Sequence, residues 1–218
     1  EDYTGTLWFG TDGAGLSYYD EHLEKFHSFI NYQVPEDIHI DVVRAIEVDS
    51  SGLVWIGTSG KGLTQYRPKT NSWRTFTADF MDENAIASDR IMSLLADDHN
   101  ELWIGTQGNG LDILDSIGNF VHYSENSPVP LSAETVWCIF KDKYNRVWLG
   151  TREQGLILFD KKKGELEKYQ HDSQSQNSLP SNNIRTIAQA GDGDLWVATE
   201  SDGIAYFDVE NKTFKAYK

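Results

Sequence analysis

The 218-residue sequence has few of the residues that mark several common protein classes. Its single cysteine, Cys138, excludes an internal disulfide and leaves the redox compartment open. Lysine and arginine total 19 against 34 aspartate and glutamate, giving a formal net charge of -15. Such a charge argues against a nucleic-acid partner, which needs basic surface. No run approaches the ~20 apolar residues of a membrane span, so we expect no direct membrane insertion.

The chain also lacks a signal peptide, and it begins at Glu1 rather than methionine. We therefore expect a processed or excised product. No interdomain linker or low-complexity tract is visible. We expect the whole of residues 1–218 to form a single structural segment.

What the sequence does contain is one motif in five copies, clearest at Leu102-Trp103-Ile104-Gly105-Thr106. The copies are marked by Trp8, Trp55, Trp103, Trp148 and Trp196, which are separated by 47, 48, 45 and 48 residues. A period in the forties that carries several strand signals per repeat indicates the blade of a β-propeller.

The motif predicts a strand that is buried on both faces. Alternation sends Trp55 and Gly57 to one face and Val54, Ile56 and Thr58 to the other, and both sets are largely apolar. The glycine beside the tryptophan predicts close approach of another group. A glycine in the following turn occurs in every copy, and we expect it to need a positive φ. These turn glycines are Gly15, Gly62, Gly110, Gly155 and Gly203.

Reading outward from the motif predicts an all-β fold of nineteen strands. Three strands form a truncated first blade, and each of four later blades has four antiparallel strands, as in a partial propeller. The expected blades span about residues 1–30, 42–77, 88–123, 134–169 and 183–217. The polar connections between them, at about 30–41, 78–88, 124–133 and 170–182, are expected to be loops that can vary without harming the blades.

Three features together resemble the two-component regulator propeller repeat. They are the Trp-Ile-Gly-Thr-x-Gly-x-Gly-Leu motif, strands that end in an aromatic residue and aspartate such as Phe159-Asp160, and the segment Ser178–Ile184. The resemblance implies the extracytoplasmic, periplasmic sensor region of a hybrid two-component histidine kinase from a Bacteroides-type bacterium. It also implies glycan-derived ligands as the usual signal class. The kinase and the other downstream parts of such proteins are missing from this chain.

One set of variable positions is a candidate binding site. The starts of the first strands hold Arg44, Met92, Trp137 and Arg185 at equivalent positions, each directly after a residue that is apolar in every copy. In a propeller this strand lines the central axis, and arginine with tryptophan offers a sugar both donors and a stacking surface. The ligand-binding candidates are Arg44, Arg90, Trp137, Arg152 and Arg185. The alternative, which we rank ahead, is that these side chains fill the channel and bond loop carbonyls.

Other constellations receive structural interpretations. The six histidines show no zinc spacing, so we predict no metal and no cofactor. Asp192-Gly193-Asp194 is read as a turn rather than a calcium site. The glycines around Gly57 are followed by a strand and not a helix, so they do not form a phosphate loop. Cys138 occupies a position of small residues and is expected to be a buried spacer rather than a nucleophile.

The leading functional prediction is a sensor module without catalysis that binds an oligosaccharide or another small molecule and relays the signal to the rest of its parent protein. The alternative is a scaffold for protein interaction or dimerisation, and a propeller lyase or hydrolase ranks third. No nucleophile–base pair or carboxylate cluster supports an enzyme. We also expect self-association through the first and last blades, whose broad faces would be uncovered in an open arc.

Overall fold

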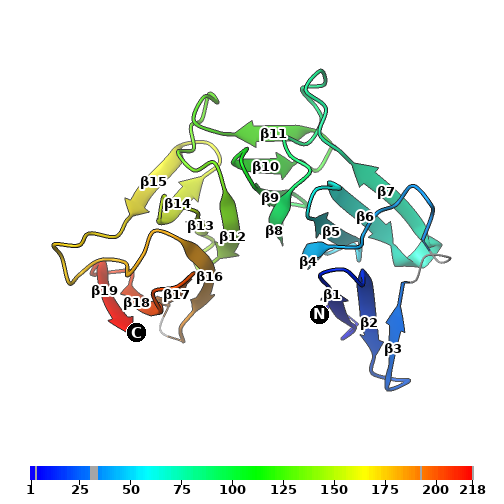
Figure 1. Cartoon of the computed structure of the whole chain (residues 1–218), viewed down its shortest axis with the longest axis horizontal. Coiled ribbons are helices and arrows are strands. Elements are labelled where there is room, and N and C mark those ends of the chain that lie inside the picture. Colours follow the sequence, from blue (N-terminus) through cyan, green and yellow to red (C-terminus); the bar gives the residue numbers. More distant parts are fainter. Residues whose placement is uncertain (3, 30–33, 192, 218) are drawn as a thin grey trace. The chain divides into compact units, whose positions relative to one another are not determined.

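The computed structural model describes residues 1–2, 4–29, 34–191 and 193–217, and nearly all of its regular structure is β-sheet (Figure 1). The chain divides into two compact units. The first comprises Glu1–Thr106 and Asp112–Val121, and the second comprises Gln107–Leu111 and His122–Lys218. Each unit is described by itself below.

The first unit contains two whole sheets and part of a third. Blade 1 has the order β1-β2-β3, blade 2 the order β4-β5-β6-β7, and blade 3 the order β11-β10-β9-β8. The strands are β1 (Leu7–Gly10), β2 (Leu16–Asp20), β3 (Lys25–Ser28), β4 (Val43–Val48), β5 (Val54–Thr58), β6 (Leu63–Arg67), β7 (Ser72–Phe76), β8 (Ile91–Ala96), β9 (Leu102–Thr106), β10 (Leu111–Leu114) and β11 (Phe120–Tyr123). Blade 3 contributes its residues to both units.

The second unit contains blade 4, of order β12-β13-β14-β15, and blade 5, of order β16-β17-β18-β19. Their strands are β12 (Val136–Lys141), β13 (Val147–Thr151), β14 (Leu156–Asp160), β15 (Gly164–Tyr169), β16 (Ile184–Gln189), β17 (Leu195–Thr199), β18 (Ile204–Asp208) and β19 (Thr213–Tyr217). In the described residues the only helix is the 3₁₀ turn η1 (Pro68–Thr70), which lies between β6 and β7. The predicted all-β fold of propeller blades, with three strands in the first and four in each of the others, is confirmed.

The motif strands β5 and β9 are buried at every residue, as predicted for a strand with two buried faces. The motif strands β1 and β17 are partly exposed. The motif glycine, which is Ala198 in the fifth copy, lies close to the next blade at Gly57 and Gly150. A Cβ on Gly57 would lie 2.5 Å from Cγ2 of Ile91, and one on Gly150 would lie 2.8 Å from Cγ2 of Ile184. Only a residue without a side chain lets the next blade pack this closely.

The turn glycines have the positive φ that the sequence predicts. Their φ values lie at 76° or 85°, in the left-handed region. A Cβ on Gly62, Gly110 or Gly155 would also overlap a carbonyl oxygen at the end of the blade's fourth strand. The threonine that closes the motif bonds across the same turn, since Thr58 Oγ1 donates to the Gly62 carbonyl at 2.8 Å. Conformation and space therefore both require glycine here.

A repeated hydrogen bond anchors the tryptophans of blades 1 to 4. The indole N–H of Trp148 donates to Oδ2 of Asp142 at 2.9 Å, while Oδ1 of the same carboxylate accepts the backbone N–H groups of Tyr144 and Arg146. The matching indole bonds run from Trp8 to Asp2, from Trp55 to Asp49 and from Trp103 to Asp97, at 3.0, 2.9 and 3.2 Å. In blade 5 the equivalent of the aspartate is Ala190. One aspartate thus fixes both the turn and the tryptophan.

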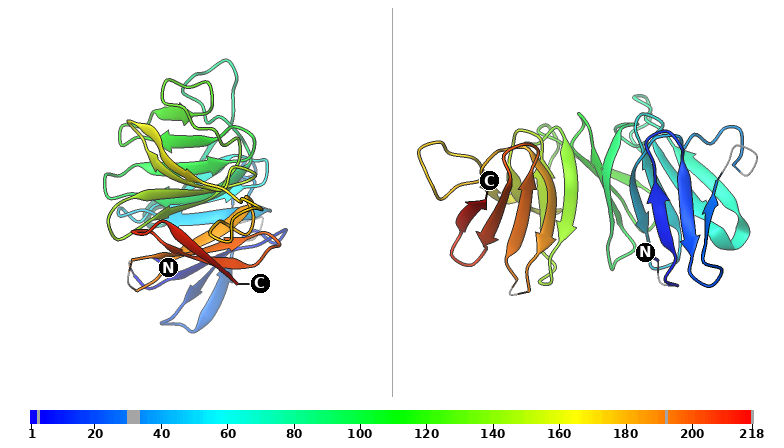
Figure 2. Two further views of the ribbon diagram at one scale, coloured as in Figure 1. Left: turned by 90° about the vertical axis from the view of Figure 1, so that its left-hand side faces the viewer. Right: turned by 60° about the horizontal axis from the view of Figure 1, so that its bottom comes forward.

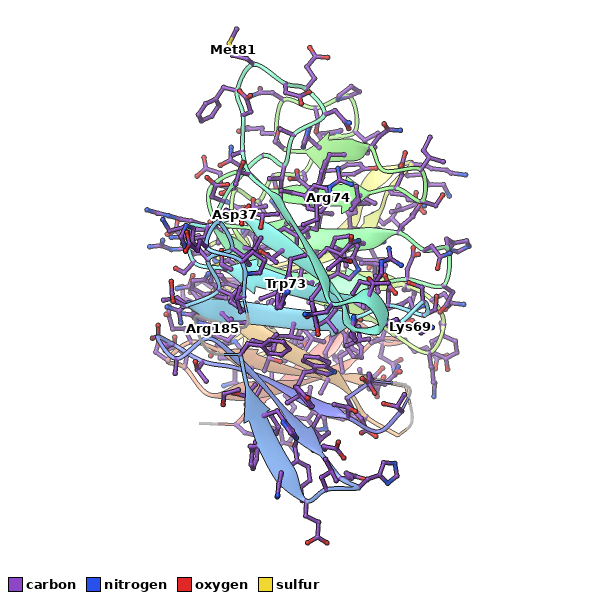
Figure 3. The ribbon with its side chains drawn as sticks, turned by 90° about the vertical axis from the view of Figure 1, so that its right-hand side faces the viewer. Asp37, Lys69, Trp73, Arg74, Met81 and Arg185 are labelled. Carbon is purple, nitrogen blue, oxygen red and sulfur yellow. The ribbon has the colours of Figure 1, made fainter. Side chains whose placement is uncertain are left out.

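The connections between blades are less free than the sequence analysis expected. Each one buries an apolar residue, namely Ile40, Ile86, Leu131 or Leu179, with at most 5% of its surface exposed. Two connections also cap the following blade, because Asn84 Oδ1 accepts the Phe120 N–H at 2.8 Å and Asn177 Oδ1 accepts the Phe214 N–H at 2.6 Å. Only parts of these segments project freely, such as the tip at Met81 (Figure 3). Free variation is therefore limited to the tips.

We predict that Trp103→Ala destabilises the chain by about 3–5 kcal/mol, as for other large truncations in a core. The side chain is 4% exposed and hydrogen-bonded to Asp97. Trp196→Ala is the matched control, because Trp196 holds the same motif position but is 36% exposed. Chemical denaturation of both variants measures the difference. A loss for Trp103→Ala no larger than for Trp196→Ala would contradict the packing described here.

The aspartate anchors also predict a loss of stability in acid. Burial by itself would raise the pKa of Asp142, but the bonds from Trp148 and Arg146 outweigh it and lower the pKa below the ordinary 3.8; the pKa of Asp97 is lowered in the same way. Because the folded pKa is depressed, the stabilisation is complete above about pH 4 and is lost as pH falls through the folded pKa. Asp142→Asn should therefore cost about 1–3 kcal/mol at pH 7 and flatten the decline in stability below pH 4. Asp37→Asn, at an exposed position, serves as the control. An unchanged acid profile in Asp142→Asn would refute this role.

Candidate functional site

The variable positions singled out in the sequence are β-bulges. In each four-stranded blade the first strand shifts register once, between Val43 and Ala45, Ile91 and Ser93, Val136 and Cys138, or Ile184 and Thr186. The extra residue in each shift is Arg44, Met92, Trp137 or Arg185. A bulge takes one residue out of the alternating pattern and re-aims its side chain. These residues can therefore vary in size and charge while their neighbours remain in the core.

Two of the predicted residues meet in the second unit. The guanidinium carbon of Arg185 lies 3.6 Å from the ring centroid of Trp137, within the range of a cation–π interaction. Nη2 of Arg185 also forms a short ion pair with Oε1 of Glu200. The side chains of Arg185 and Glu200 remain 43% and 42% exposed. Arg185 is labelled in Figure 3. Trp137, Arg185 and Glu200 are called the arginine–tryptophan cluster below.

The neighbouring turns hold this cluster in place. The Glu200 N–H donates to the Asn183 carbonyl at 2.9 Å, and the Glu153 N–H donates to Oδ1 of Asn183 at 3.0 Å. Arg152 is tied by its own N–H to the Thr135 carbonyl. Its side chain is half exposed and lies 3.4 Å from Glu153. Asn183 therefore links the turns that carry Arg152 and Glu200.

The other predicted residues lie in the first unit and make different contacts. Nη2 of Arg44 lies 3.6 Å from Oδ1 of Asp12, and both side chains are exposed. Arg90 is exposed and its backbone N–H donates to Ser88 Oγ at 3.2 Å. Arg44, Arg152 and Arg185 are therefore each paired with a carboxylate. The structure brings Trp137 and Arg185 together, and it pairs Arg44 and Arg152 with carboxylates instead.

Groups that could do other chemistry are engaged in the fold. Burial raises the pKa of the Cys138 thiol to about 12, so this sulfur stays protonated and is a poor nucleophile. Asp192 lies outside the described residues. Asp194 accepts the Tyr206 hydroxyl at 2.9 Å and the Val209 N–H at 3.0 Å. Within the described part of the chain, no three histidine, cysteine or acidic side chains gather as a metal site would require.

The first unit also holds two cavities that sequence reasoning missed. One, of about 440 Å³, lies under the segment 34–41 and includes Glu36, His39 and Asp41. The other, of about 340 Å³, lies between blades 2 and 3 and is lined by Gln65, Arg74, Phe76, Asn100 and Asp115 among others. None of the five predicted binding residues lines either cavity.

A sequence signal for the second cavity existed. The guanidinium of Arg74 lies 4.3 Å from the Phe76 ring centroid, and Figure 3 shows Arg74 next to Trp73 on β7. Aligning the fourth strands places His27, Val121, Glu167 and Lys215 at the position of Arg74. The residue type at this position therefore varies among the blades as it does at the bulge positions. Such variation indicates a side chain whose identity the repeat does not constrain.

Comparison with known proteins identifies the repeat. The model of the family described as "Two component regulator propeller" matches residues 85–108, 130–153 and 178–201. No curated protein shows significant sequence similarity to the chain. No helix among the described residues combines the length and apolar character needed to cross a membrane.

Three solved structures illustrate the shared fold. The chain is 24% identical to a protein named as the extracellular domain of a hybrid two component system from B. thetaiotaomicron, with a TM-score of 0.81, covering 100% of this chain and 29% of that one. PorZ, a surface component of the type-IX secretion system of Porphyromonas gingivalis, is 22% identical with a TM-score of 0.69, over 94% and 31% of the two chains. Virginiamycin B lyase from Staphylococcus aureus is 13% identical with a TM-score of 0.71, over 100% and 67%.

At these identities the likeness shows a common fold alone, and the chain spans less than a third of the first two structures. The family match and the five bladed sheets agree with the motif found in the sequence. The resemblance predicted from the sequence is confirmed: the chain carries two component regulator propeller repeats, at residues 85–108, 130–153 and 178–201.

Proposed function

We propose that residues 1–218 form one propeller segment of the extracytoplasmic sensor region of a hybrid two-component system. In this proposal the segment binds a glycan-derived ligand in the periplasm and relays that event to the rest of its parent protein. The family of the repeat and the fold shared with an extracellular domain of such a system support this role. The observation that carries the binding proposal is the exposed contact of Arg185 with Trp137.

The arginine–tryptophan cluster suits a hydroxyl-rich or acidic sugar. The indole offers an apolar face to the C–H side of a sugar ring, while the guanidinium has five N–H donors in a fixed plane. Glu200 occupies only part of that donor set. The stacking on Trp137 also holds the guanidinium in one orientation, which lowers the entropy lost when a ligand binds.

The location of Trp137 and Arg185 on β-bulges also favours a role in ligand recognition. The bulges at Trp137 and Arg185 lie between residues that pair with the second strand of the blade, β13 or β17. A site on rigid strands keeps its geometry better than one on a free loop, and bulges often border functional sites. The connections at about 124–133 and 170–182 lead directly into these two strands.

A binding role fits the described groups better than catalysis does. The Cys138 thiol is held protonated, and the arginines at the bulges are paired with Asp12 or Glu200 rather than with a nucleophile. The likeness to virginiamycin B lyase, at 13% identity, extends to the fold alone. We therefore propose that this chain has no catalytic activity of its own.

Calorimetry with a panel of neutral and acidic oligosaccharides tests the proposal. We expect Arg185→Ala and Trp137→Ala each to weaken binding of the best ligand at least about tenfold, which corresponds to ~1.4 kcal/mol. Arg67→Ala, at an exposed arginine on β6, is the matched control and should leave affinity unchanged. Arg44→Ala measures separately whether the first unit contributes.

Two results would contradict this assignment. Unchanged affinity in both Arg185→Ala and Trp137→Ala would remove the cluster from the site. Tight binding that is lost in Arg74→Ala instead would place the ligand in the cavity between blades 2 and 3.

A second candidate function, protein interaction, is favoured by a specific observation. Several large apolar side chains of blades 1 and 5 are exposed, including Phe26 at 66% and Tyr217 at 41%. Exposed apolar patches of this kind commonly mark interaction surfaces.

A further inference from the structure

The cavity between blades 2 and 3 has the features of a second binding site, separate from the arginine–tryptophan cluster. Blades 2 and 3, drawn from light blue to green in Figure 2, are neighbouring sheets, and β4 and β5 of one contact β8 of the other. The cavity has a volume of about 340 Å³, and its lining residues lie between Asp49 and Gly118, all in the first unit. Small-molecule sites commonly have volumes of roughly 300–1,000 Å³, so this one has room for a small ligand.

Two hydrogen-bond donors lie side by side on the wall of this cavity. Arg74 on β7 and Gln65 on β6 are directly opposite in register, so their side chains share one face of blade 2. Among the described residues, the Arg74 guanidinium has no ion pair and the Gln65 side-chain amide has no hydrogen bond. The guanidinium lies over the Phe76 ring, 4.3 Å from its centroid. Stacking uses the face of the guanidinium and leaves the N–H groups at its edge for an acceptor.

The corresponding position in the second unit has the partner that Arg74 lacks. Glu167 of blade 4 is aligned with Arg74, and its carboxylate pairs with Nζ of Lys212 at 2.8 Å. The same carboxylate accepts the Tyr169 hydroxyl. In blade 3 the turn residue at the position of Lys212 is Gly118, which also has a positive φ but carries no side chain. The charged residue of the wall is therefore paired between blades 4 and 5 and unpaired between blades 2 and 3.

A second difference between the two interfaces lies beside the motif tryptophan. In blade 4, Nε of Arg146 pairs with Asp142 at 2.6 Å, and its guanidinium carbon lies 5.5 Å from the Trp148 ring centroid. Leu53 holds the position of Arg146 in blade 2 and lines the cavity. The wall beside the tryptophan is therefore apolar in blade 2 and charged in blade 4.

The carboxylates that line the cavity do not make it a cation site. Asp49 accepts two backbone N–H groups of its own turn and the Trp55 indole N–H. Asp115 likewise accepts two backbone N–H groups of its turn. These donors offset part of the negative charge. Glu101 is the third carboxylate of the lining, so an anion meets some repulsion and charge alone would not hold it.

We propose that the cavity between blades 2 and 3 binds an amphipathic monocarboxylate, a small molecule with one carboxylate and an apolar body. The carboxylate accepts N–H groups of Arg74 and of the Gln65 amide. Hydrogen bonds between a guanidinium and a carboxylate are roughly twice as strong as neutral ones. The apolar body lies against Leu53, Phe76 and Leu114, which line the same cavity. Because this site and the arginine–tryptophan cluster share no residue, either proposal can fail without the other.

Three probes that share a phenylmethyl group test the proposal. Phenylacetate carries a carboxylate, 2-phenylethanol a hydroxyl and 2-phenylethylamine an ammonium group. In NMR titrations of the whole chain, we expect phenylacetate to bind at least about tenfold more tightly than the alcohol, and the amine to bind most weakly. The alcohol measures the apolar contribution by itself, so the ratio of the two affinities reports on Arg74 and Gln65.

Substitutions on the wall should change this preference in defined directions. Arg74→Gln removes the charge and should abolish the advantage of phenylacetate over the alcohol. Arg74→Glu copies the residue of blade 4 and should invert the order, so that the amine binds best. Gln65→Leu copies Leu158 of blade 4 and should weaken phenylacetate alone. Circular dichroism checks that each variant is folded.

Matched controls separate this site from other arginines. Arg67→Gln alters an exposed arginine on β6 outside the lining and should leave all three affinities unchanged. Arg185→Ala, which disrupts the arginine–tryptophan cluster, should also leave phenylacetate binding unchanged. Arg74→Gln should in turn leave the affinity of the cluster for its best oligosaccharide unchanged.

Three results would overturn the proposal. The first is a wild-type chain that binds no phenylacetate at concentrations up to about 10 mM, the weakest affinity expected for a ligand of this size. The second is an alcohol or amine that binds as tightly as phenylacetate. The third is a preference for phenylacetate that persists in folded Arg74→Gln, since the carboxylate would then lie elsewhere.

Discussion

The packing of one blade's tryptophan side on the next blade is the contact on which the other features of this chain depend. The glycine beside each tryptophan makes room for it, as at Gly57 and Gly150. The aspartate that binds the indole N–H keeps the ring in position and satisfies a donor that would otherwise be buried without a partner. Because the blades bury apolar side chains against one another, much of the stability comes from contacts between successive blades.

Much of the fold could be predicted from the sequence because the same motif occurs five times. The strand number, the buried tryptophans and the positive φ of Gly155 and its equivalents follow from local patterns. The role of the aspartate was missed, although Asp49 and its equivalents stand six residues before the tryptophan in four copies and Ala190 replaces them in the fifth. The bond joins two side chains across a turn, and strand periodicity carries no information on such a contact.

The candidate site was predictable in its positions but not in its geometry. Variation among Arg44, Met92, Trp137 and Arg185 pointed to side chains that the core does not constrain. Whether these residues form bulges depends on how the first strand pairs with the second. The register between β12 and β13, for example, shifts between Val136 and Cys138. The pattern within one strand does not encode its register with another. The carboxylates that pair with Arg44 and Arg185 come from turns that are not adjacent in sequence, so Asp12 and Glu200 were not expected as partners.

These acidic partners also change what the arginines can do. A guanidinium alone on a surface would attract any anion, but one already paired with a carboxylate gains little from simple charge. A ligand of the arginine–tryptophan cluster must therefore offer what Glu200 does not, namely apolar surface for Trp137 together with acceptors in the plane of the guanidinium. In a chain of charge -15 this selection matters, because long-range attraction favours cations while the site itself is built from an arginine. In the proposed binding role, recognition would therefore depend on shape and stacking at the bulge more than on net charge.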